Sequence, residues 1–269
     1  MLKVKINGKV YEAEKGEYIL EVCRRNRILI PTLCHHDGLP GLGSCRVCVV
    51  EVNEGNGNRV VVSCAYPLNR DCEVFTESEK IKNIRKTILS MLKTRAAAAE
   101  PKTGDRLSSL CQIYGVKENE RFTAPKAEKH LATACVLCGL CVRACTSIGT
   151  GAISTVSRGV NKKISTPYGE PSADCIGCGS CAAICPVKAI ECTEDAERSS
   201  VEHNSVGHRS VWGRKFRLLC CASCKKPFAT EEEYAWAQKK AGFSKKEEIL
   251  CETCRKRKSG DVFAVAFGL

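Results

Sequence analysis

The sequence lacks the long apolar segments and the catalytic motifs that define several common classes of protein. No stretch approaches the roughly 20 apolar residues that a membrane-spanning helix needs, and the first residues, MLKVKINGKVYEAEKGEYIL, contain no apolar core like that of a secretory signal peptide. There is no GxGxxG after a strand, no P-loop and no nucleophile motif. We therefore expect a cytoplasmic chain without a membrane span and without the parts of a catalyst.

Cysteine, in contrast, is unusually frequent, at 21 of 269 residues. Thiols stay reduced in the cytoplasm, where closely spaced cysteines bind metal more often than they form disulfides. Because many of these cysteines fall in tight repeats, the sequence favours a metal protein over a disulfide scaffold.

The pattern of apolar residues predicts an α+β chain in four parts. Residues 1–78 alternate as a small β-rich domain does, and residues 79–130 are expected to form a helical connector. Residues 131–197 contain an internal repeat, and residues 198–269 form a linker and a tail that carries a separate set of cysteines.

Local patterns predict the individual elements. They are a hairpin turning at Asn7-Gly8, helices at 18–27, from Ser78 onward, at 107–113 and at 231–241, and strands at 46–52, 59–63 and in DCEVFTE. Residues 196–215 have the composition of a polar linker. The apolar end, DVFAVAFGL, is a strand or a docking segment, and the sequence does not decide between them.

The strongest pattern is a CxxCxxCxxxC unit that occurs twice, in ACVLCGLCVRACTSIGTGAI and in DCIGCGSCAAICPVKAIEC. Two-residue gaps let three thiolates wrap around one [4Fe–4S] cube, while the fourth cysteine of each run ligates the other cube. Zinc knuckles would leave the third and fourth cysteines of each run unused. Gly139, Gly177 and Gly179 permit the tight turns. The predicted ligands are Cys135, Cys138, Cys141 and Cys185 for the first cube, and Cys145, Cys175, Cys178 and Cys181 for the second.

A different spacing occurs in the first part, at Cys34, Cys45, Cys48 and Cys64. A plant-type [2Fe–2S] ferredoxin has a shorter first gap but the same C-x2-C core, and one helix before Cys34 fits a β-grasp scaffold. Four thiolates without a competing histidine at ligand spacing favour a [2Fe–2S] cluster over zinc. For His35 and His36, beside Cys34, we expect surface positions or contacts outside the ligand shell.

The tail contains two CxxC knuckles, formed by Cys221, Cys224, Cys251 and Cys254. Two such knuckles suit tetrahedral zinc in a small zinc-ribbon-like unit. A third [4Fe–4S] cluster is the alternative, and Cys220 could replace Cys221 as a ligand. The cysteines left over are expected to pack in the core; they are Cys23, Cys72, Cys111, Cys192 and Cys220.

The formal net charge of +12 counts every cysteine as neutral. Three clusters and one zinc ion, each with four thiolates, would remove about 8 of these charges. The basic balance therefore mainly compensates for buried negative metal sites, and we do not expect a nucleic-acid partner.

The order of these motifs resembles a known family. PTLCHHDGLPGLGSCRVCVVEV, VVSCAYPL, IKNIRKTILSMLK, CVLCGLCVRACTSIGTGAISTVSRG and CIGCGSCAAICPVKAI are similar to the N-terminal iron–sulfur region of the large complex I subunit. They are more similar still to the iron–sulfur diaphorase subunit of bidirectional NAD-reducing hydrogenases. The segment CCASCKKPFATEEEYAWA with ILCETCRK resembles the tail of iron–sulfur subunits in hydrogenase and formate hydrogenlyase complexes.

One departure from the family concerns the connector. Family members usually carry an additional [4Fe–4S] cluster there, bound by one histidine and three cysteines. Here Arg95 or a neighbour takes the histidine position, Asp105 falls where one cysteine would lie, and Cys111 alone cannot hold a cube. We predict that this cluster is absent.

The resemblance implies a subunit that relays single electrons through one [2Fe–2S] and two [4Fe–4S] clusters. Its implied partners are an NAD(P)-linked flavoprotein subunit, which splits the hydride pair, and a second redox subunit of a hydrogenase, formate dehydrogenase or electron-bifurcating complex. A free-standing polyferredoxin is the first alternative, and a redox-responsive nucleic-acid protein is a more distant one.

Overall fold

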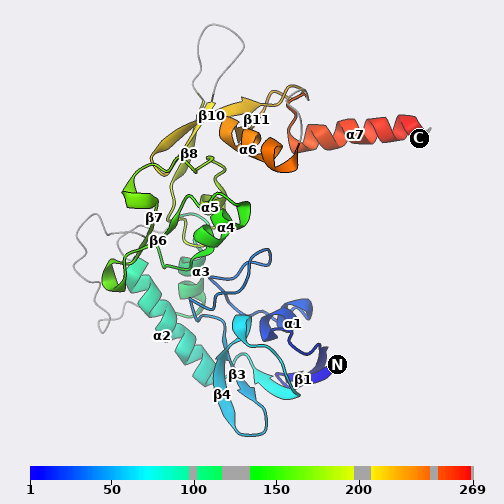
Figure 1. Ribbon diagram of the computed structural model, residues 1–269. Helices are drawn as coiled ribbons and strands as arrows, with labels where there is room; N and C mark the ends of the chain where they lie inside the picture. Colours follow the sequence, from blue (N-terminus) through cyan, green and yellow to red (C-terminus); the bar gives the residue numbers. More distant parts are fainter. Residues whose placement is uncertain (97–101, 117–133, 197–206, 243–247, 268–269) are drawn as a thin grey trace.

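The structure is a computed structural model that describes residues 1–96, 102–116, 134–196, 207–242 and 248–267. The chain forms an elongated arrangement of helices and sheets, with the first part at one end, the tail at the other and the cysteine repeats between them (Figure 1). The expectation of an α+β chain is therefore confirmed. Within the described residues, none of the helices combines the length and the apolar character that crossing a membrane requires.

The first part is a five-stranded mixed sheet with one helix on it. The strand order is β2-β1-β5-β3-β4, with β1 and β5 parallel and the other neighbours antiparallel. The helix α1 buries Ile19, Leu20 and Val22 against the sheet, where they join an apolar core. The elements are β1 (Leu2–Ile6), β2 (Lys9–Ala13), α1 (Ile19–Arg25), β3 (Val49–Asn53), β4 (Asn58–Val62) and β5 (Cys72–Phe75), with a short 3-10 helix at Ser63–Ala65.

In this part the predicted hairpin turn is confirmed, whereas the predicted start of the third strand is wrong. The hairpin turn lies at Asn7 and Gly8, both with positive φ, as expected. The strand predicted from Arg46 begins only at Val49. Arg46 has φ +60°, a left-handed conformation that no strand residue adopts, because the chain there turns through the cysteine loop.

The connector consists of α2 (Glu79–Ala96) and α3 (Arg106–Ile113), both close to their predicted positions. The Ser78 hydroxyl accepts a hydrogen bond from the Ile81 N–H and so caps the start of α2. A fully buried Arg85 donates to the Val49 carbonyl, the Glu77 carboxylate and the Tyr114 hydroxyl. This side chain ties α2 to the sheet on one side and to the end of α3 on the other.

The repeat region places two equivalent helices side by side. Each begins after a glycine in the left-handed conformation, Gly139 with φ +71° and Gly179 with φ +73°. The helices are α4 (Leu140–Ile148) and α5 (Ser180–Ala183), accompanied by the hairpin of β6 (Ser154–Val156) and β7 (Lys163–Ser165) and by 3-10 turns at Gly159–Asn161 and Pro167–Gly169.

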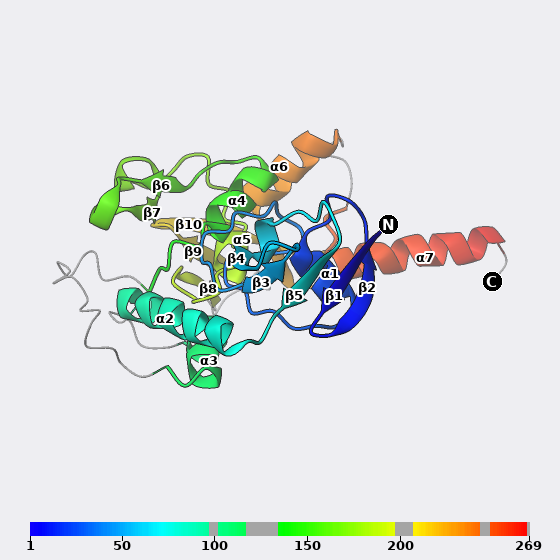
Figure 2. The same ribbon diagram turned by 90° about the horizontal axis from the view of Figure 1, so that it is seen from below.

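The tail is built on an antiparallel sheet of order β11-β10-β9-β8, with α6 and α7 beside it. Its elements are β8 (Cys192–Ala196), β9 (Gly207–Val211), β10 (Arg214–Cys220), β11 (Pro227–Thr230), α6 (Glu231–Ala241) and α7 (Glu252–Phe267). The end of the chain, for which a strand was one expectation, is helical as far as Phe267, and α7 extends away from the rest of the molecule (Figures 1 and 2).

The prediction of a polar linker at 196–215 is wrong for its second half. Residues 207–211 and the start of β10 are paired strands, although most side chains there are polar. The strands form because Val211 and Phe216 are buried on one side of the sheet. The sheet also takes β8 from residues 192–196, so it crosses the boundary predicted at 197.

A second apolar core joins the first part, the connector and the repeats. Leu33 and Val47 come from the first part, Leu89 and Leu107 from the connector, and Leu140 from the first repeat. The same cluster contains the cysteines Cys34, Cys45, Cys138 and Cys185. The core therefore surrounds side chains from two different predicted ligand sets.

Candidate cluster and metal sites

The first site lies in the β-rich part, where the structure brings Cys34, Cys45, Cys48 and Cys64 together in a buried position. None of the four is more than 6% exposed. Three lie in the loop between α1 and β3, and Cys64 lies in the 3-10 turn after β4. A Cβ on Gly41 would lie 2.8 Å from the Cys64 carbonyl oxygen, so only glycine lets the loop pass this close.

Hydrogen bonds among these thiols favour the charged form of Cys34 and Cys48, whereas the same bonds raise the pKa of their donors Cys45 and Cys64. The Cys45 N–H lies 3.5 Å from Cys34 Sγ, and hydrogen bonds from Cys45 and Cys64 hold the pKa of Cys34 far below its ordinary value. A hydrogen bond from Cys64 lowers the pKa of Cys48 to about 7. Four buried sulfur donors of this kind fit an iron–sulfur cluster, whose ligands are thiolates.

The two histidines of this loop make contacts within the loop itself. His35 Nε2 lies 3.3 Å from the Asp37 carboxylate, and His36 Nδ1 accepts a hydrogen bond from the Gly38 N–H at 3.2 Å. Each ring therefore has one nitrogen engaged by a neighbouring loop residue.

The first repeat forms a second four-thiol group together with Cys185, which follows α5. Burial raises the pKa of Cys138 to about 11, and the charges of Cys185 and Cys135 add to this rise. Burial likewise raises the pKa of Cys141 to about 12, with contributions from Cys138, Cys135 and Cys185. The thiol of Cys185, the fourth of the second repeat, therefore acts electrostatically on the first three thiols of the first repeat.

The reciprocal arrangement holds for the second repeat. Burial raises the pKa of Cys175, and the charges of Cys178 and Cys145 act in the same direction. Burial raises the pKa of Cys181 to about 11, and the charges of Cys178 and Cys175 add to this rise. Cys145 lies on α4 of the first repeat and acts on Cys175 of the second, which agrees with the crossed sets that the spacing predicts; the ligand sets themselves stay a prediction.

Backbone N–H groups point at several of these sulfurs. The Leu137 N–H lies 3.4 Å from Cys135 Sγ, and the Ala189 N–H lies 3.3 Å from Cys185 Sγ. The loops turn through positive φ at Leu137 and Gly139 in one repeat and at Gly177 and Gly179 in the other. Amide donors around four converging thiols match the needs of a negatively charged cluster.

Two contacts at the second group come from side chains that the sequence did not single out. The Thr150 hydroxyl lies 3.1 Å from Cys145 Sγ. The indole Nε1 of Trp212, in the turn between β9 and β10, donates to Cys181 Sγ at 3.4 Å. Neither residue belongs to a recognisable motif, so spacing could not have identified them.

The first site and the first repeat are in direct contact. The charge of Cys34 contributes to the raised pKa of Cys138, and the Ser44 hydroxyl donates to the Cys138 carbonyl at 3.2 Å. The Arg143 guanidinium, on α4, donates to the carbonyls of Cys34 and Pro40. The two groups of thiols are therefore neighbours within one packed interface.

The connector residues at the positions of an additional cluster have structural partners here. The Asp105 carboxylate caps α3 by accepting from the Leu107 N–H at 2.8 Å. Arg95 donates to the carbonyls of Cys135 and Lys162. Cys111 is buried, and its Sγ lies 3.9 Å from the Leu89 carbonyl.

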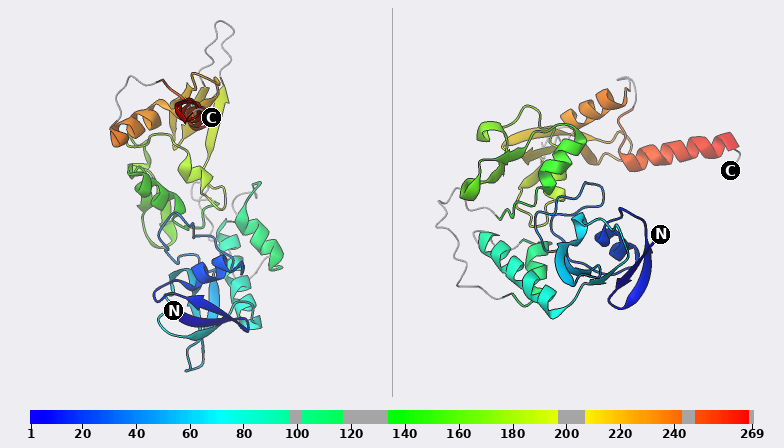
Figure 3. Two further views of the ribbon diagram at one scale, coloured as in Figure 1. Left: turned by 90° about the vertical axis from the view of Figure 1, so that its right-hand side faces the viewer. Right: turned by 60° about the horizontal axis from the view of Figure 1, so that its bottom comes forward.

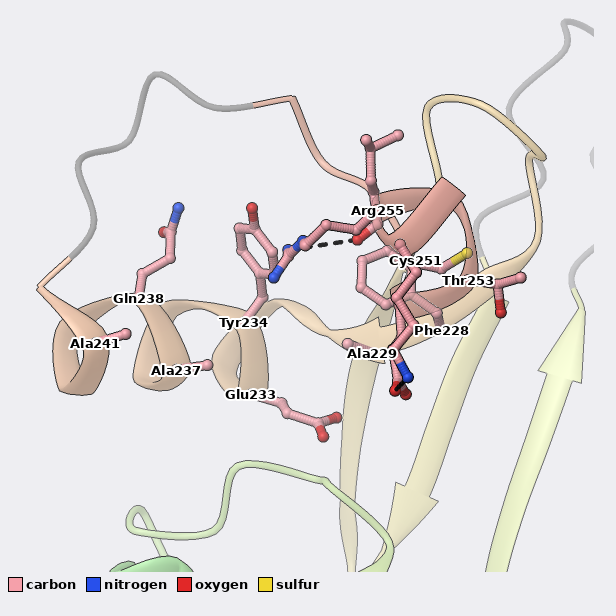
Figure 4. Close-up of a pocket in the computed structure, with 13 residues that line it drawn as sticks. Phe228, Ala229, Glu233, Tyr234, Ala237, Gln238, Ala241, Cys251, Thr253 and Arg255 are labelled. Carbon is pink, nitrogen blue, oxygen red and sulfur yellow. Dashed lines mark hydrogen bonds and ion pairs between the residues drawn. The ribbon is translucent and has the colours of Figure 1, made fainter. Parts of the chain in front are cut away.

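The tail holds the fourth group, formed by Cys221, Cys224, Cys251 and Cys254, whose sulfur atoms all lie within 4.8 Å of one another. Cys224 Sγ and Cys251 Sγ are 3.8 Å apart. N–H groups of Cys224 and Cys251 lower the pKa of Cys221 to about 6. Figure 4 shows the groove beside this group, between α6 and the second knuckle, with Cys251, Phe228 and Tyr234 in its wall.

The remaining cysteines differ in their surroundings. Burial raises the pKa of Cys23 to about 12 and that of Cys72 to about 11, as expected for core thiols. Cys192 is half-buried, and Cys220 is exposed and outside the tail group. The prediction of core packing is therefore wrong for Cys220, because it lies at the end of β10 where the side chain points out of the sheet.

Comparison with known proteins identifies two domains. Residues 1–79 match the family described as a 2Fe-2S iron-sulfur cluster binding domain, and residues 134–189 match a 4Fe-4S dicluster domain. The chain is 32% identical over 212 residues to the NADP-reducing hydrogenase subunit HndD of Solidesulfovibrio fructosivorans, a match that covers 71% of this chain and 36% of the relative. It is 31% identical over 205 residues to the NADH-ubiquinone oxidoreductase 75 kDa subunit of Reclinomonas americana, a match that covers 71% of this chain and 29% of the relative.

A solved structure shows a similar fold. The crystal structure of an NAD+-reducing [NiFe]-hydrogenase in the H2-reduced state matches with a TM-score of 0.58 and 27% identity, over 70% of this chain and 86% of that one. The chain spans only 29% to 36% of the length of the two curated relatives named above. It nonetheless carries, in this order, a [2Fe–2S] cluster binding domain and a 4Fe–4S dicluster domain, and it is similar to subunits of NAD(P)-linked hydrogenases and of NADH-ubiquinone oxidoreductase.

Proposed function

We propose that this chain is an electron-relay subunit that passes single electrons between an NAD(P)-linked flavoprotein and a second redox subunit. The proposed ligands are Cys34, Cys45, Cys48 and Cys64 for a [2Fe–2S] cluster, Cys135, Cys138, Cys141 and Cys185 for one [4Fe–4S] cluster, and Cys145, Cys175, Cys178 and Cys181 for the other. When bound, these clusters supply one-electron redox chemistry. The chain holds their sulfur ligands, excludes water from them and sets their spacing.

One observation carries this proposal: the first site and the first cube's site share one apolar core. Cys34 and Cys45 lie in the same buried cluster as Cys138 and Cys185. A relay needs neighbouring sites at short range in a dry environment, and the interface at Ser44 and Arg143 supplies both. The crossed sets in α4 and α5 then continue the series to the second cube's site.

The partners are proposed from the relatives. HndD is named as a subunit of an NADP-reducing hydrogenase, and the solved structure is an NAD+-reducing [NiFe]-hydrogenase. A nicotinamide delivers a hydride, whereas iron–sulfur clusters accept single electrons, so a flavin-bearing partner must separate the pair.

We also propose that the connector holds no cluster. Arg95 and Asp105 are engaged by backbone groups, and Cys111 is packed in the core. The hydrogen bond from Ser44 to the Cys138 carbonyl and the shared core place the first site next to the first cube's site, which makes an intermediate site in the connector unnecessary. A chain with one two-iron and two four-iron clusters contains about 10 iron atoms, whereas an additional cube would raise this to about 14.

For the tail we propose zinc in preference to a third [4Fe–4S] cluster. Two thiolates on one tetrahedral zinc, with bonds of about 2.3 Å, lie about 3.8 Å apart. The separation of Cys224 Sγ and Cys251 Sγ is 3.8 Å. In a cube each thiolate binds a different iron, which requires a wider spread than the 4.8 Å limit that contains all four sulfurs here.

Metal analysis and anoxic co-purification test these proposals together. We expect about 10 iron and about one zinc per chain, together with a flavoprotein in the purified complex. Iron near 14 with one zinc ion would show that the connector holds a cube, whereas iron near 14 with zinc near zero would favour a cluster in the tail. Isolation as a free chain that exchanges electrons with several enzymes would instead indicate a polyferredoxin.

A further inference from the structure

The tail sheet lies directly on the loop of the second repeat. Arg214, on β10, donates to the carbonyls of Ser172, Ala173 and Cys175 at 2.8, 3.1 and 2.9 Å. Arg209, on β9, donates to the Gly177 carbonyl at 3.0 Å. The views in Figures 1 and 3 show β8, β9 and β10 beside the repeat helices. The tail therefore covers one cube's site specifically, and it lies beyond residue 189, where the matched cluster domains end.

The packing between the two parts is too close to be incidental. Phe216 is fully buried, and a Cβ on Gly177 would lie only 2.5 Å from its ring. The Thr230 hydroxyl, at the N-terminus of α6, donates to the Ile176 carbonyl. The sheet thus packs on the CIGCGSC loop, where Gly177 is buried and the other residues are half-buried.

Within this cover, the Trp212 side chain reaches a sulfur that we propose as a ligand of the second cube. It occupies the turn between β9 and β10 with φ +52°, an uncommon conformation for a bulky residue. Its Nε1 lies 3.4 Å from Cys181 Sγ, one of the proposed ligands of the second cube. The strained turn, anchored on one side by Arg209 and on the other by Arg214, aims the indole at the sulfur.

We propose that the tail tunes the second [4Fe–4S] cluster and that Trp212 raises its reduction potential through this hydrogen bond; the proposal rests on the second ligand set of the proposed function. Reduction adds negative charge to a cluster and its thiolates, so an N–H donor binds the reduced state more strongly than the oxidised state. The reduction potential of a cluster depends on hydrogen bonds to its sulfur atoms and on solvent access. The tail donates such a hydrogen bond and limits the access of solvent to the site. Trp212 is a positioning and tuning residue that touches the cluster's ligand.

The test is a redox titration of Trp212→Phe, followed by paramagnetic resonance, in the complete chain with its metals. The variant keeps an aromatic ring and removes the N–H donor. We expect the midpoint reduction potential of one of the two [4Fe–4S] clusters to fall. At the wild-type midpoint potential, the ratio of reduced to oxidised cluster should then drop about three- to tenfold. The upper limit corresponds to about 59 mV for a one-electron couple.

Trp236→Phe is the matched control. Trp236, on α6, also packs on the repeat region, since a Cβ on Gly149 would lie 3.6 Å from its ring and Lys240 lies over the ring at 4.6 Å. It contacts the end of α4 instead of a ligand sulfur, so all midpoints should remain at their wild-type values.

A second variant covers the case in which Trp212→Phe loses iron. Incorporation of 3-benzothienylalanine at position 212 replaces the indole N–H by sulfur and preserves both rings. A fall in the same midpoint supports the proposal, and an unchanged midpoint with full iron content overturns it. Absence of four-iron signals in the wild-type protein would overturn the proposed function as well, so the two failures are distinguishable.

Discussion

Gly177 shows how a single residue links the second cube's site to the tail. It has φ +67°, and a Cβ there would lie 2.5 Å from the buried Phe216 ring. We expect Gly177→Ala to cost about 1–2 kcal/mol from the left-handed backbone and about 1–3 kcal/mol more from overpacking. Loosening of the CIGCGSC loop should lower the iron content from about ten atoms per chain to about six, which metal analysis will measure.

Gly169→Ala provides the control for this prediction. Gly169 has φ +80°, so alanine is strained there as well, but nothing lies within 4 Å of a Cβ at that position. This variant should retain its iron. Equal iron loss in both variants would show that backbone strain, and not the contact with Phe216, is responsible.

At the residue scale, the sequence predicts which cysteines converge but not what surrounds them. The gaps between Cys135, Cys138 and Cys141 suit a loop around one centre, so spacing alone predicts the group. Trp212 and Arg214 act through tertiary contacts from a sheet more than 25 residues later in the chain. Such contacts leave no periodic or spaced pattern in a single sequence.

At the scale of elements, α2 depends on a charged residue in a position that its pattern assigns to the core. Ile81, Arg85 and Leu89 are the buried stripe, four residues apart. The apolar pattern predicted the helix correctly, because Ile81 and Leu89 lie on one face. It could not predict that Arg85 is buried between them, since its partners at Val49 and Tyr114 come from other elements.

This arrangement predicts a large effect of Arg85→Ala. The substitution leaves a cavity and removes the donor to the buried Val49 carbonyl, at a cost of about 2–4 kcal/mol. The melting temperature, followed by the circular dichroism of the helices, should therefore be several degrees lower than in the wild type. Lys86→Ala, at the exposed neighbouring position, should change stability by less than about 0.5 kcal/mol. Similar melting temperatures for both variants would contradict the role assigned to Arg85.

The tail knuckles make another prediction at this scale. Cys224 lies in the turn between β10 and β11, and Cys251 immediately precedes α7. We expect Cys224→Ser to lower zinc from about one ion per chain to almost none, while iron stays near ten. Cys220→Ser should retain zinc, because Cys220 is exposed and outside the four-sulfur group. Loss of four iron atoms in place of one zinc would show that the tail holds a cluster.

At the scale of the whole molecule, the parts are arranged in space in the order in which they follow one another in the sequence. The first part, the repeats and the tail follow one another along the long direction of the chain (Figure 3). The sequence predicted the order of these parts, because each has its own spacing of cysteines. It did not predict that the polar stretch before Phe216 would pair with β8 and close over the second repeat, because strand pairing at this range depends on tertiary packing.

The interface between the first part and the repeats gives the last prediction. Arg143 donates from α4 to the carbonyls of Cys34 and Pro40 and so holds the first site against the first cube's site. Hydrogen bonds from a charged donor contribute about 1.5–3 kcal/mol, so Arg143→Met should raise the undocked population about tenfold or more. We expect weaker magnetic coupling between the reduced [2Fe–2S] and [4Fe–4S] centres and slower electron transfer between them, with unchanged iron content. Arg158→Met, at an exposed position after β6, should leave both properties unchanged. Undiminished coupling in Arg143→Met would mean that the apolar core alone fixes the two sites.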